Sequence, residues 1–440
     1  MKGIFEYHKQ NVFSDLCSQM KCENGDIPKN VRDWFKQNLQ WVINFIGDET
    51  NIEFYWAASV IIEQLKGMVE GYNDTSLTLD ELWLYNSRSQ IFDVYRKLNN
   101  ISSDNEPIIE RHGTVLINHF KENSKSLNIT IGHSAWRGYA TSSPVSKRYR
   151  IKFRSTFSMT DRRSLSSYPL MIHSDEGLTI NGNQLIVVAS TIAIANYDLY
   201  KEISPQGIPG WLRALAADYV SFGGKEWAKI YSSIAAGSSG IEWVVIDTKK
   251  FIYGEGILPE LLMVVDEIPG KIKSADATDY LKKKHYFASY DVPFDTEIFQ
   301  SAGYSELSAN NPDFYSYNES SRAKIIQELA NTNLNSSAFR EIMRYNSVIS
   351  NMYDRGVSPR QDIVDHADFV RCSGGVDSKF TSISRALHLH WEGAVGPYFD
   401  DNINKFTFDG SNTCETILHD HVPNELAFKW QPHYFDIQKE

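Results

Sequence analysis

The chain has 440 residues, of which 42% are hydrophobic and 13% aromatic, and its formal net charge is −11. This length and composition are those of a globular protein with one large core or two to three structural units, and they argue against a disordered chain. Charged residues of one sign are not gathered into blocks. The sequence therefore gives no reason to expect nucleic acid as a partner.

The first residues, M-K-G-I-F-E-Y-H-K-Q, lack the apolar core of a signal peptide. No stretch approaches the roughly 20 apolar residues of a membrane-spanning helix. We therefore expect a soluble chain without a transmembrane segment, which is either cytoplasmic or, after removal of a leader, secreted or lysosomal. The sequence leaves the oligomeric state open.

The four cysteines, Cys17, Cys22, Cys372 and Cys414, have the spacing of neither a zinc site nor a dense disulfide framework. One disulfide between any two of them is compatible with the sequence. The redox compartment of the chain therefore stays open.

The first hundred residues are predicted to be helical. Apolar residues recur at helical spacing over residues 31–46 and 52–72, and a third helix is predicted after Asp80 with apolar positions up to Tyr95. Many of these positions are aromatic, which we interpret as a packing layer in preference to a ligand-binding box. The polar stretch N-N-I-S-S-D-N-E, at 99–106, predicts a linker. It divides the chain into a helical segment, 1–110, and a second unit, 111–440.

Beyond the linker the apolar period changes from helical to alternating. The stretches R-H-G-T-V-L-I-N-H-F, at 111–120, and N-I-T-I-G-H-S-A-W, at 128–136, predict the two arms of a β-hairpin. Further strands are predicted over 148–157, 184–191, 243–247 and 261–267, and helices over 209–222 and 225–234. Strands that bracket helices without a regular βαβ rhythm indicate an α+β protein and not a doubly wound parallel sheet.

Gly113 and Thr114 stand where the first arm of this hairpin begins. A threonine at the first position of a strand, after a small flexible residue, is a place where a chain could cut itself and expose an N-terminal nucleophile. The new α-amine, with an ordinary pKa of about 7.7 to 8.0, could then act as the base for the neighbouring hydroxyl. The alternative is that the pair merely forms a turn that leads into the strand.

Two further motifs are weaker indicators of function. S-G-G-V-D-S, at 373–378, resembles a phosphate-binding loop but lacks its lysine, and we interpret it as a glycine turn. His388 with His390, and His419 with His421, form two H-x-H pairs. Because neither pair has a clear third ligand nearby, we interpret these side chains as satisfied or solvated histidines and expect no metal or other cofactor.

An ordered set of short segments resembles the phospholipase B-like family, also called the laminin-ancestor or LAMA-like proteins. The segments are G-H-S-A-W at 132–136, S-S-Y-P at 166–169, E-W-A-K-I at 226–230, E-W-V-V-I-D at 242–247, E-I-P-G at 267–270, S-A-D-A-T-D at 274–279, A-S-Y-D-V-P-F at 288–294, S-A-G-Y at 301–304, S-R-A-K-I at 321–325, M-R-Y-N at 343–346 and G-G-V-D-S-K-F-T-S at 374–382. Their order and spacing match over about three hundred residues, which makes the set specific although no single motif is decisive.

The resemblance implies the N-terminal-nucleophile hydrolase fold, a four-layer αββα sandwich of two stacked, mostly antiparallel sheets. It also implies a helical segment before a self-cleavage point, a nucleophile at the start of the following strand, and hydrolysis of an ester or amide bond of an acyl lipid. The predicted layout of this chain agrees with that order of elements. An acyl lipid, or another acyl small molecule, is therefore the partner that the resemblance implies.

Two departures from the family pattern concern the catalytic residues. In the most natural register the family's nucleophilic cysteine falls on Gly113, which has no side chain to attack with; a shift by one residue places Thr114 there but exchanges the two faces of the strand. The family's paired asparagines, which can donate to an oxyanion, become Gly240 and Ile241. Loss of one such donor typically slows catalysis by about 10²- to 10³-fold.

Two hypotheses follow, from different classes of protein. The first is a hydrolase that uses Thr114 as nucleophile and its own α-amine as base, with His133 and Trp136 shaping the pocket. The second is a catalytically silent relative that binds a lipid, a peptide or a protein. A third, weaker hypothesis is an uncleaved enzyme with another catalytic set, for which the sequence offers no residues.

Several further side chains are candidates for the wall of the site. We expect His133 to be structural in preference to transferring protons, since N-terminal-nucleophile chemistry needs no histidine. Ser167, in S-S-Y-P, and Arg344 and Asn346, in M-R-Y-N, are the polar candidates for the substrate pocket beside Trp136.

Overall fold

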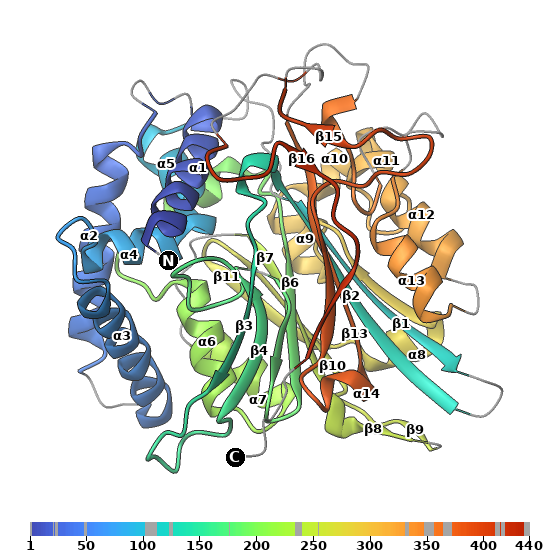
Figure 1. The fold of residues 1–440 in the computed structure, drawn as a ribbon. Helices are drawn as coiled ribbons and strands as arrows, with labels where there is room; N and C mark the ends of the chain where they lie inside the picture. Colours follow the sequence, from blue (N-terminus) through green and yellow to red (C-terminus); the bar gives the residue numbers. More distant parts are fainter. Residues whose placement is uncertain are drawn as a thin grey trace.

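The protein consists of a group of helices followed by two main antiparallel sheets with further helices around them (Figure 1). The computed structural model describes residues 2–20, 22, 25–47, 51–101, 112–122, 126–175, 177–233, 240–253, 255–330, 334–346, 356–363, 372–409, 414 and 419–434. The predicted α+β class and the antiparallel pairing are confirmed.

The N-terminal helices are α1 (Lys2–Met20), α2 (Lys29–Phe45), α3 (Ile52–Tyr72), α4 (Leu79–Asn86) and α5 (Ile91–Asn99). α3 has the predicted bounds, because Asn51 caps its first turn by accepting from the Phe54 N–H and Asn73 ends it in the left-handed conformation at φ 50°. The sequence did not single out α1, whose apolar residues do not follow one stripe.

The prediction of one continuous helix from Asp80 to Tyr95 is wrong, because α4 ends at Asn86 and α5 begins at Ile91. The Asn86 amide bonds outward to a distant loop: its Nδ2 donates to the Leu170 carbonyl and its Oδ1 accepts from the Ile172 N–H. Its Nδ2 also donates to the Leu82 carbonyl, four residues earlier in the same helix, and a local bond of this kind competes with the backbone pattern that continues a helix.

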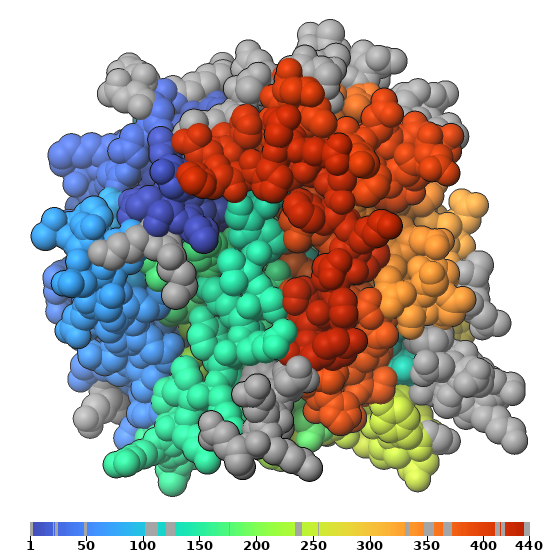
Figure 2. Space-filling model, in the orientation of Figure 1, coloured from blue at the N-terminus to red at the C-terminus, as the bar shows by residue number. Residues whose placement is uncertain are grey.

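One hydrophobic cluster joins the N-terminal helices to the rest of the molecule. It runs from Phe5 in α1 and Phe54 in α3 to Trp227 in α7 (Gly224–Ser233) and Phe339 in α13 (Ser336–Met343). At the surface, α1 lies against the C-terminal segment, drawn in dark blue and red in Figure 2, where the Asn11 amide donates to the Asp420 carbonyl. Of the predicted linker at 99–106, residues 102–106 lie outside the described part of the chain, so the division of the chain stays a prediction.

One main sheet has the strand order β11-β10-β7-β6-β5-β4-β3. Its strands are β3 (Val145–Arg150), β4 (Arg162–Ser167), β5 (Thr179–Asn181), β6 (Leu185–Thr191), β7 (Ile241–Asp247), β10 (Leu262–Ile268) and β11 (Lys271–Asp276). β6, β7 and β10, and the helices α6 (Gly210–Val220) and α7, lie where the sequence predicts them to within a few residues.

The predicted strand at 148–157 is wrong beyond Arg150, where β3 ends. The chain leaves the sheet there because Phe153 and Phe157 pack against Trp56 of α3, with ring centroids 5.5 and 6.1 Å from the Trp56 ring. These aromatic residues produced the alternating pattern, but their burial comes from a helix and not from a neighbouring strand.

The other main sheet has the order β12-β1-β2-β13-β14-β17. Its strands are β1 (His112–Glu122), β2 (Ser126–Gly138), β12 (Tyr286–Ser289), β13 (Ser373–Ser382), β14 (Trp391–Val395) and β17 (Gln431–His433). The predicted hairpin is confirmed, since β1 pairs with β2 from His112 opposite Trp136 onward. β1 is also flanked by β12, so that it is not an edge strand.

The interpretation of 373–378 as a glycine turn is wrong, because these residues belong to β13. The glycines serve close approach of another segment: a Cβ on Gly375 would lie 1.9 Å from the Ser358 Oγ, and one on Gly374 would lie 2.3 Å from the Pro359 carbonyl oxygen. Gly374 also has a φ of 141°, which L side chains rarely adopt.

The remaining elements surround the sheets. They are α8 (Thr278–Lys284), α9 (Thr296–Ser301), α10 (Tyr304–Asn310), α11 (Pro312–Tyr315), α12 (Ser321–Ala330), α14 (Ile383–Ala386), β8 (Phe251–Ile252), β9 (Gly256–Ile257), β15 (Phe406–Thr407) and β16 (Glu425–Leu426). α12 and α13 run along the sheet that contains β1 and β2 (Figure 1). Among the described residues, no helix combines the length and the apolar character needed to cross a membrane.

The two main sheets share a second hydrophobic cluster. Val115 and Ile117 of β1 belong to it together with Ile186 and Val188 of β6. Because alternate residues of a strand point to the same side, this cluster identifies the face of each sheet that is turned toward the other. We call these the facing surfaces, and the side of β1 and β2 that carries Leu116 the helix-covered side, since Leu116 packs in the cluster of the helices.

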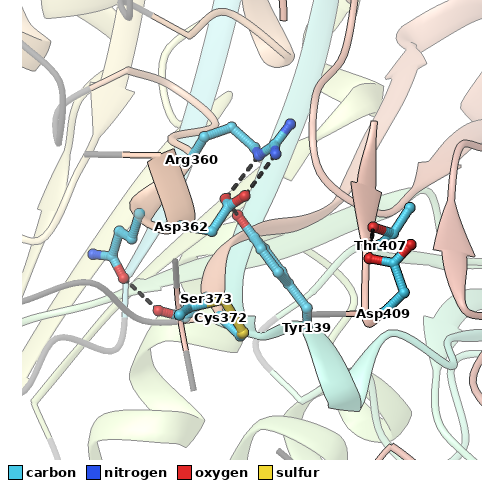
Figure 3. The surroundings of a disulfide bond; sticks show 9 residues. Tyr139, Arg360, Asp362, Cys372, Ser373, Thr407 and Asp409 are labelled. Atoms are coloured by element: carbon cyan, nitrogen blue, oxygen red, sulfur yellow. Dashed lines mark hydrogen bonds and ion pairs between the residues drawn. A yellow bond between two sulfur atoms is a disulfide. The ribbon is translucent and has the colours of Figure 1, made fainter. Parts of the chain in front are cut away.

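A disulfide joins Cys372 to Cys414, 42 residues apart in sequence, whereas Cys17 and Cys22 are free thiols. Beside it, Figure 3 shows Arg360 bound by two hydrogen bonds of 2.8 and 2.6 Å to Asp362, which also accepts from the Tyr139 hydroxyl. The disulfide therefore ties the start of β13 to a C-terminal segment, next to this buried ionic cluster.

Replacing Cys372 with serine is expected to lower the free energy of unfolding by about 2–4 kcal/mol, because the unfolded chain regains the entropy of a long closed loop. Urea denaturation of the two proteins measures the loss, and Cys22→Ser, which breaks no disulfide, is the control. An unchanged urea midpoint for Cys372→Ser would contradict the assignment of this disulfide to the folded protein.

Candidate functional site

Gly113 lies on a facing surface at one end of β1, in line with Val115 and Ile117. An ideal Cβ built on Gly113 would lie 3.4 Å from the Ser134 carbonyl oxygen, 3.5 Å from the His133 Nε2 and 3.9 Å from the Ser190 Cα of the opposite sheet. These are ordinary van der Waals contacts. Position 113 therefore has room for a Cβ, which would point toward the other sheet.

Polar side chains gather around this position, while the rest of the facing surfaces is apolar. Ser190, Glu242 and Asp266 stand opposite one another on β6, β7 and β10. We define the polar end of the facing surfaces by six buried residues: Gly113, His133, Ser190, Glu242, Asp266 and Ser289. It is the group that the strand registers bring together beside Gly113.

A chain of hydrogen bonds crosses the polar end from one sheet to the other. The Ser190 and Ser289 hydroxyls bond to each other, and Ser289 also bonds to the Glu242 carboxyl. Glu242 accepts from the Phe294 N–H at 3.0 Å, and Asp266 accepts from the Asp295 N–H at 2.6 Å.

Burial raises the pKa of Glu242 well above its usual value, and the neighbouring Asp266 carboxyl raises it further. Burial also raises the pKa of Asp266, to about 6. Two adjacent carboxylates out of water repel each other, so one proton shared between them keeps the pair from carrying two charges. The polar end therefore holds an exchangeable proton near neutral pH.

His133 is neutral in this environment. Burial lowers its pKa well below the usual value, and the nearby positive charges of Lys379 and Arg137 lower it further. The Lys379 Nζ lies 3.4 Å from the His133 Nδ1 and is held by Asp377. Since the Nδ1 accepts from the Lys379 ammonium, the Nε2, which lies 3.5 Å from the Cβ position of residue 113, carries the hydrogen of the neutral imidazole and is a donor.

Thr114 points to the helix-covered side, opposite to Gly113. It stands next to Ser134 of β2, which in turn stands opposite Ser378 of β13. Thr114 is fully buried, and its hydroxyl has no hydrogen-bond partner among the residues that the structure describes. The exchange of faces expected from a one-residue shift of register is thus visible in the positions of the two side chains.

Both polar groups of the Gly113 backbone are held by a buried ion pair. The Gly113 N–H donates to the Asp291 Oδ1 at 3.3 Å, and the Arg322 Nη1 donates to the Gly113 carbonyl at 3.4 Å and to the Asp291 Oδ2 at 2.7 Å. The Arg322 guanidinium also lies over the ring of Trp136, 3.9 Å from its centroid. The peptide carbonyl before Thr114 is therefore polarised by a positive charge.

Sequence reasoning missed Asp291 and Arg322, although both stand in segments that carry the family resemblance, A-S-Y-D-V-P-F and S-R-A-K-I. It also missed Ser190, Glu242 and Asp266. A charged residue inside a matching segment is the signal that could have found three of these five, Glu242, Asp291 and Arg322.

The other predicted site residues are dispersed. Trp136 is linked to the Gly113 backbone by Arg322, whose guanidinium contacts both. The Trp136 Nε1 donates to the Val357 carbonyl. Ser167 lies in β4, where its hydroxyl donates to the His173 carbonyl of its own loop. Arg344 and Asn346 follow α13 on the helix-covered side, where both are buried.

Gly240 directly precedes β7, and its neighbourhood explains why it carries no amide. A Cβ there would lie 2.0 Å from the Ile192 carbonyl oxygen, so no side chain fits in this backbone arrangement. The residues before it, 235–239, lie outside the described part of the chain. Among the described residues, position 240 cannot supply the oxyanion donor of the family pattern.

The structure gives each histidine of the H-x-H pairs an aromatic neighbour. The rings of His388 and His390 are 5.7 Å apart, His419 stacks on Phe408, and His421 lies against Tyr7. Within the described residues, no group of three or more His, Cys, Asp or Glu side chains is placed to hold a metal ion.

The fold is an α+β arrangement with two main antiparallel sheets and a candidate site at the start of β1, and sequence comparison gives the family. The sequence model of the phospholipase B family matches residues 2–433, so the chain belongs to this family. The resemblance seen in the sequence is confirmed and extends over nearly the whole chain. Membership implies a hydrolase.

Individual relatives are distant but cover most of the chain. The chain is 27% identical to Phospholipase B-like protein B of Dictyostelium discoideum, over 93% of this chain and 74% of that protein. It is 26% identical to Phospholipase B-like 1 of Rattus norvegicus, over 96% and 78%, and 26% identical to Phospholipase B-like protein G of Dictyostelium discoideum, over 92% and 74%.

Proposed function

We propose that the chain is a hydrolase of an ester or amide bond in an acyl lipid, and that it frees Thr114 as its nucleophile by cutting the peptide bond between Gly113 and Thr114. The observation that carries this proposal is the hydrogen bonding at the peptide bond between Gly113 and Thr114. Its carbonyl accepts a hydrogen bond from the buried Arg322, and within the described part of the chain the Thr114 hydroxyl has no hydrogen-bond partner. The lipid substrate is suggested by the family and by the names of the relatives.

The cleavage step needs only these groups and water. The Thr114 Oγ1 attacks the Gly113 carbonyl carbon, the bond from that carbon to the Thr114 nitrogen breaks, and the hydroxyl proton passes to the departing nitrogen. Water then hydrolyses the resulting ester, which leaves a Gly113 carboxylate and a free Thr114 hydroxyl and α-amine. Arg322 stabilises the negative oxygen in both steps, an interaction whose loss typically costs about 10²- to 10³-fold in rate.

After cleavage, Thr114 would carry both groups that acyl transfer requires. Its α-amine, with an ordinary pKa of about 7.7 to 8.0, removes the proton from its own hydroxyl, which then attacks the substrate carbonyl. The proposal takes the two main sheets as the inner layers of an αββα sandwich, in support of which Val115 and Ile117 share a hydrophobic cluster with Ile186 and Val188.

A second candidate function, a catalytically silent protein that binds a lipid, a peptide or a protein, is favoured by a different observation. The position that faces the polar end is Gly113, which has no nucleophile, while Thr114 faces the opposite side. Gly240 also has no space for an amide side chain.

Intact-mass measurement and N-terminal sequencing of the freshly purified chain decide between the two. If Thr114 is the nucleophile, two fragments are expected, the second beginning Thr-Val-Leu-Ile, and they should copurify because α1 and α3 share a core with Trp227 and Phe339. Thr114→Ala should abolish cleavage, and Thr114→Ser should retain it.

A single uncut species at 50.3 kDa, identical in the parent chain and in Thr114→Ala, would rule out the Thr114 mechanism and leave the silent candidate. Fragments that meet at any other peptide bond would also contradict the proposal.

A further inference from the structure

Arg344 and Asn346 lie in a buried position at the C-terminal end of α13. Their exposed fractions are 6% and 7%. The Ser378 hydroxyl of β13 donates to the Met343 carbonyl at 3.0 Å, which fixes the end of the helix on the sheet. The two side chains therefore belong to an ordered part of the molecule on the helix-covered side.

Arg344 is a buried cation without a carboxylate partner among the described residues. Its guanidinium donates to the Pro397 carbonyl at 2.8 Å, and burial lowers its pKa to about 10 despite the nearby negative charge of Asp377. An unpaired buried charge is costly unless another group compensates it.

The described charged side chains around the end of α13 include one positive charge without a carboxylate partner. Arg360 is paired with Asp362 through two hydrogen bonds, and Lys379 is paired with Asp377. Glu341 of α13 is exposed and points its charge into solvent. Of the described cations that surround the end of α13, Arg344 is the one whose charge is not matched.

Asn346 adds an independent observation. Neither its Nδ2 nor its Oδ1 has a hydrogen-bond partner among the described residues, although the side chain is more than nine-tenths buried. Buried amides are almost always hydrogen-bonded, because leaving both groups unpaired costs several kcal/mol. A polar ligand that meets both residues would remove this cost.

We propose that Arg344 and Asn346 bind the oxyanion of a polar ligand, a phosphate ester in the first place, with Arg344 neutralising the charge and the Asn346 amide donating to a further oxygen. Guanidinium groups suit phosphate oxygens because they can donate two parallel hydrogen bonds. The ligand identity rests on the proposed function, since the head group of a phospholipid substrate supplies such a phosphate.

The position of the site fits that ligand. Thr114, Ser134 and Ser378 stand side by side on three adjacent strands, which places Ser378 about 10 Å from Thr114 at the usual strand spacing. Ser378 is bonded to Met343, the residue before Arg344. The phosphate site would therefore lie on the same side of the sheet as the Thr114 hydroxyl, at a separation that part of a lipid molecule can span.

The test is titration calorimetry of the full chain with sn-glycerol 3-phosphate, inorganic phosphate and acetate. Arg344→Gln should weaken binding of glycerol 3-phosphate by about 10- to 100-fold, the range expected for a charge-assisted hydrogen bond. Lys29→Gln, which removes the same charge from an exposed side chain, should bind like the parent. Arg344→Gln should also keep or raise the melting temperature, because it removes an unmatched buried charge.

Each outcome of these titrations either supports or overturns the proposed anion site. Loss of binding in Arg344→Gln and in Asn346→Leu supports the site. Equal affinity for acetate and glycerol 3-phosphate supports the site but makes its ligand a carboxylate, and tight binding of inorganic phosphate alone assigns it to the free ion. The proposal is overturned if none of the three anions binds, or if Arg344→Gln binds like the parent. Binding is measured without turnover and can be repeated in Thr114→Ala, so failure of self-cleavage would leave this result interpretable.

Discussion

A Gly113→Cys variant is expected to cut its own chain before residue 113 and to expose a new N-terminus that reads Cys-Thr-Val-Leu. The backbone at Gly113 has no positive φ and an ideal Cβ meets nothing closer than 3.4 Å, so the substitution should fold without strain. The thiol would enter the polar end next to the neutral His133 and supply the nucleophile for cleavage. The attacked carbonyl would be that of His112.

Intact-mass measurement and N-terminal sequencing check this result, with Gly113→Ala as the control that adds a Cβ without a nucleophile. The double variant Gly113→Cys with Thr114→Ala should still be cut, because the two residues face opposite sides of β1. A folded, uncut Gly113→Cys chain would show that position 113 is not the nucleophile position of the fold, whatever Thr114 does.

The two cleavage experiments together separate the registers. Cleavage of the parent at Thr114 would mean that the nucleophile has moved by one residue and now works from the helix-covered side, near Ser134 and Ser378. Cleavage of Gly113→Cys alone would mean that the fold retains the geometry of the reaction and that the chain has lost only its nucleophile. The second result would favour the silent candidate for the natural chain.

The sequence predicted correctly those elements whose bounds depend on residues close together in the chain. α3 follows from a helical period with Asn51 and Asn73 at its ends, and the β1–β2 hairpin follows from two alternating stretches. The failures have non-local causes: Phe153 packs against Trp56, about a hundred residues earlier, and Gly375 is a glycine because Ser358 crosses it.

The site was predicted only where it is one continuous stretch. Gly113, Thr114 and His133, which the sequence named as candidates, lie within one hairpin. Glu242 and Asp266 become neighbours only through the register of β7 and β10, which no sequence pattern gives. The same holds for Asp291 and Arg322, which meet at the Gly113 backbone from two separate parts of the chain.

The pair of carboxyls at the polar end predicts a stability that depends on pH in a definite direction. In the folded protein the pKa of Glu242 is raised well above its usual value, and the pKa of Asp266 is raised to about 6. The folded state therefore keeps a proton that the unfolded chain loses near pH 4. The unfolded state binds fewer protons in this window, so the free energy of unfolding falls as pH rises from about 4 to the folded pKa values. Asp266 alone, raised by about two units at 1.36 kcal/mol per unit, accounts for roughly 3 kcal/mol.

Buried histidines produce the opposite slope, in a pH range that overlaps that of the carboxyl pair and extends below it. Burial lowers the pKa of His133 well below its usual value and that of His173 to about 4. The unfolded chain protonates these side chains below about pH 6.5 while the folded protein does not, so they favour unfolding progressively as pH falls. The pH optimum of stability therefore results from two opposing sets of buried groups.

Glu242→Gln is expected to remove most of the loss of stability between pH 5 and pH 8 that the carboxyl pair causes, and to leave the acidic limb unchanged. The glutamine amide can donate to Asp266 at every pH, so that no shared proton is needed and Asp266 can ionise beside a donor. Urea denaturation at pH 5, 6, 7 and 8 measures the effect against Glu328→Gln, which makes the same charge change at an exposed site.

If the parent and Glu242→Gln lose stability in parallel as pH rises, the buried pair does not hold the proton. The raised stability at low pH must then come from another carboxyl such as Asp218, whose pKa burial also raises to about 6.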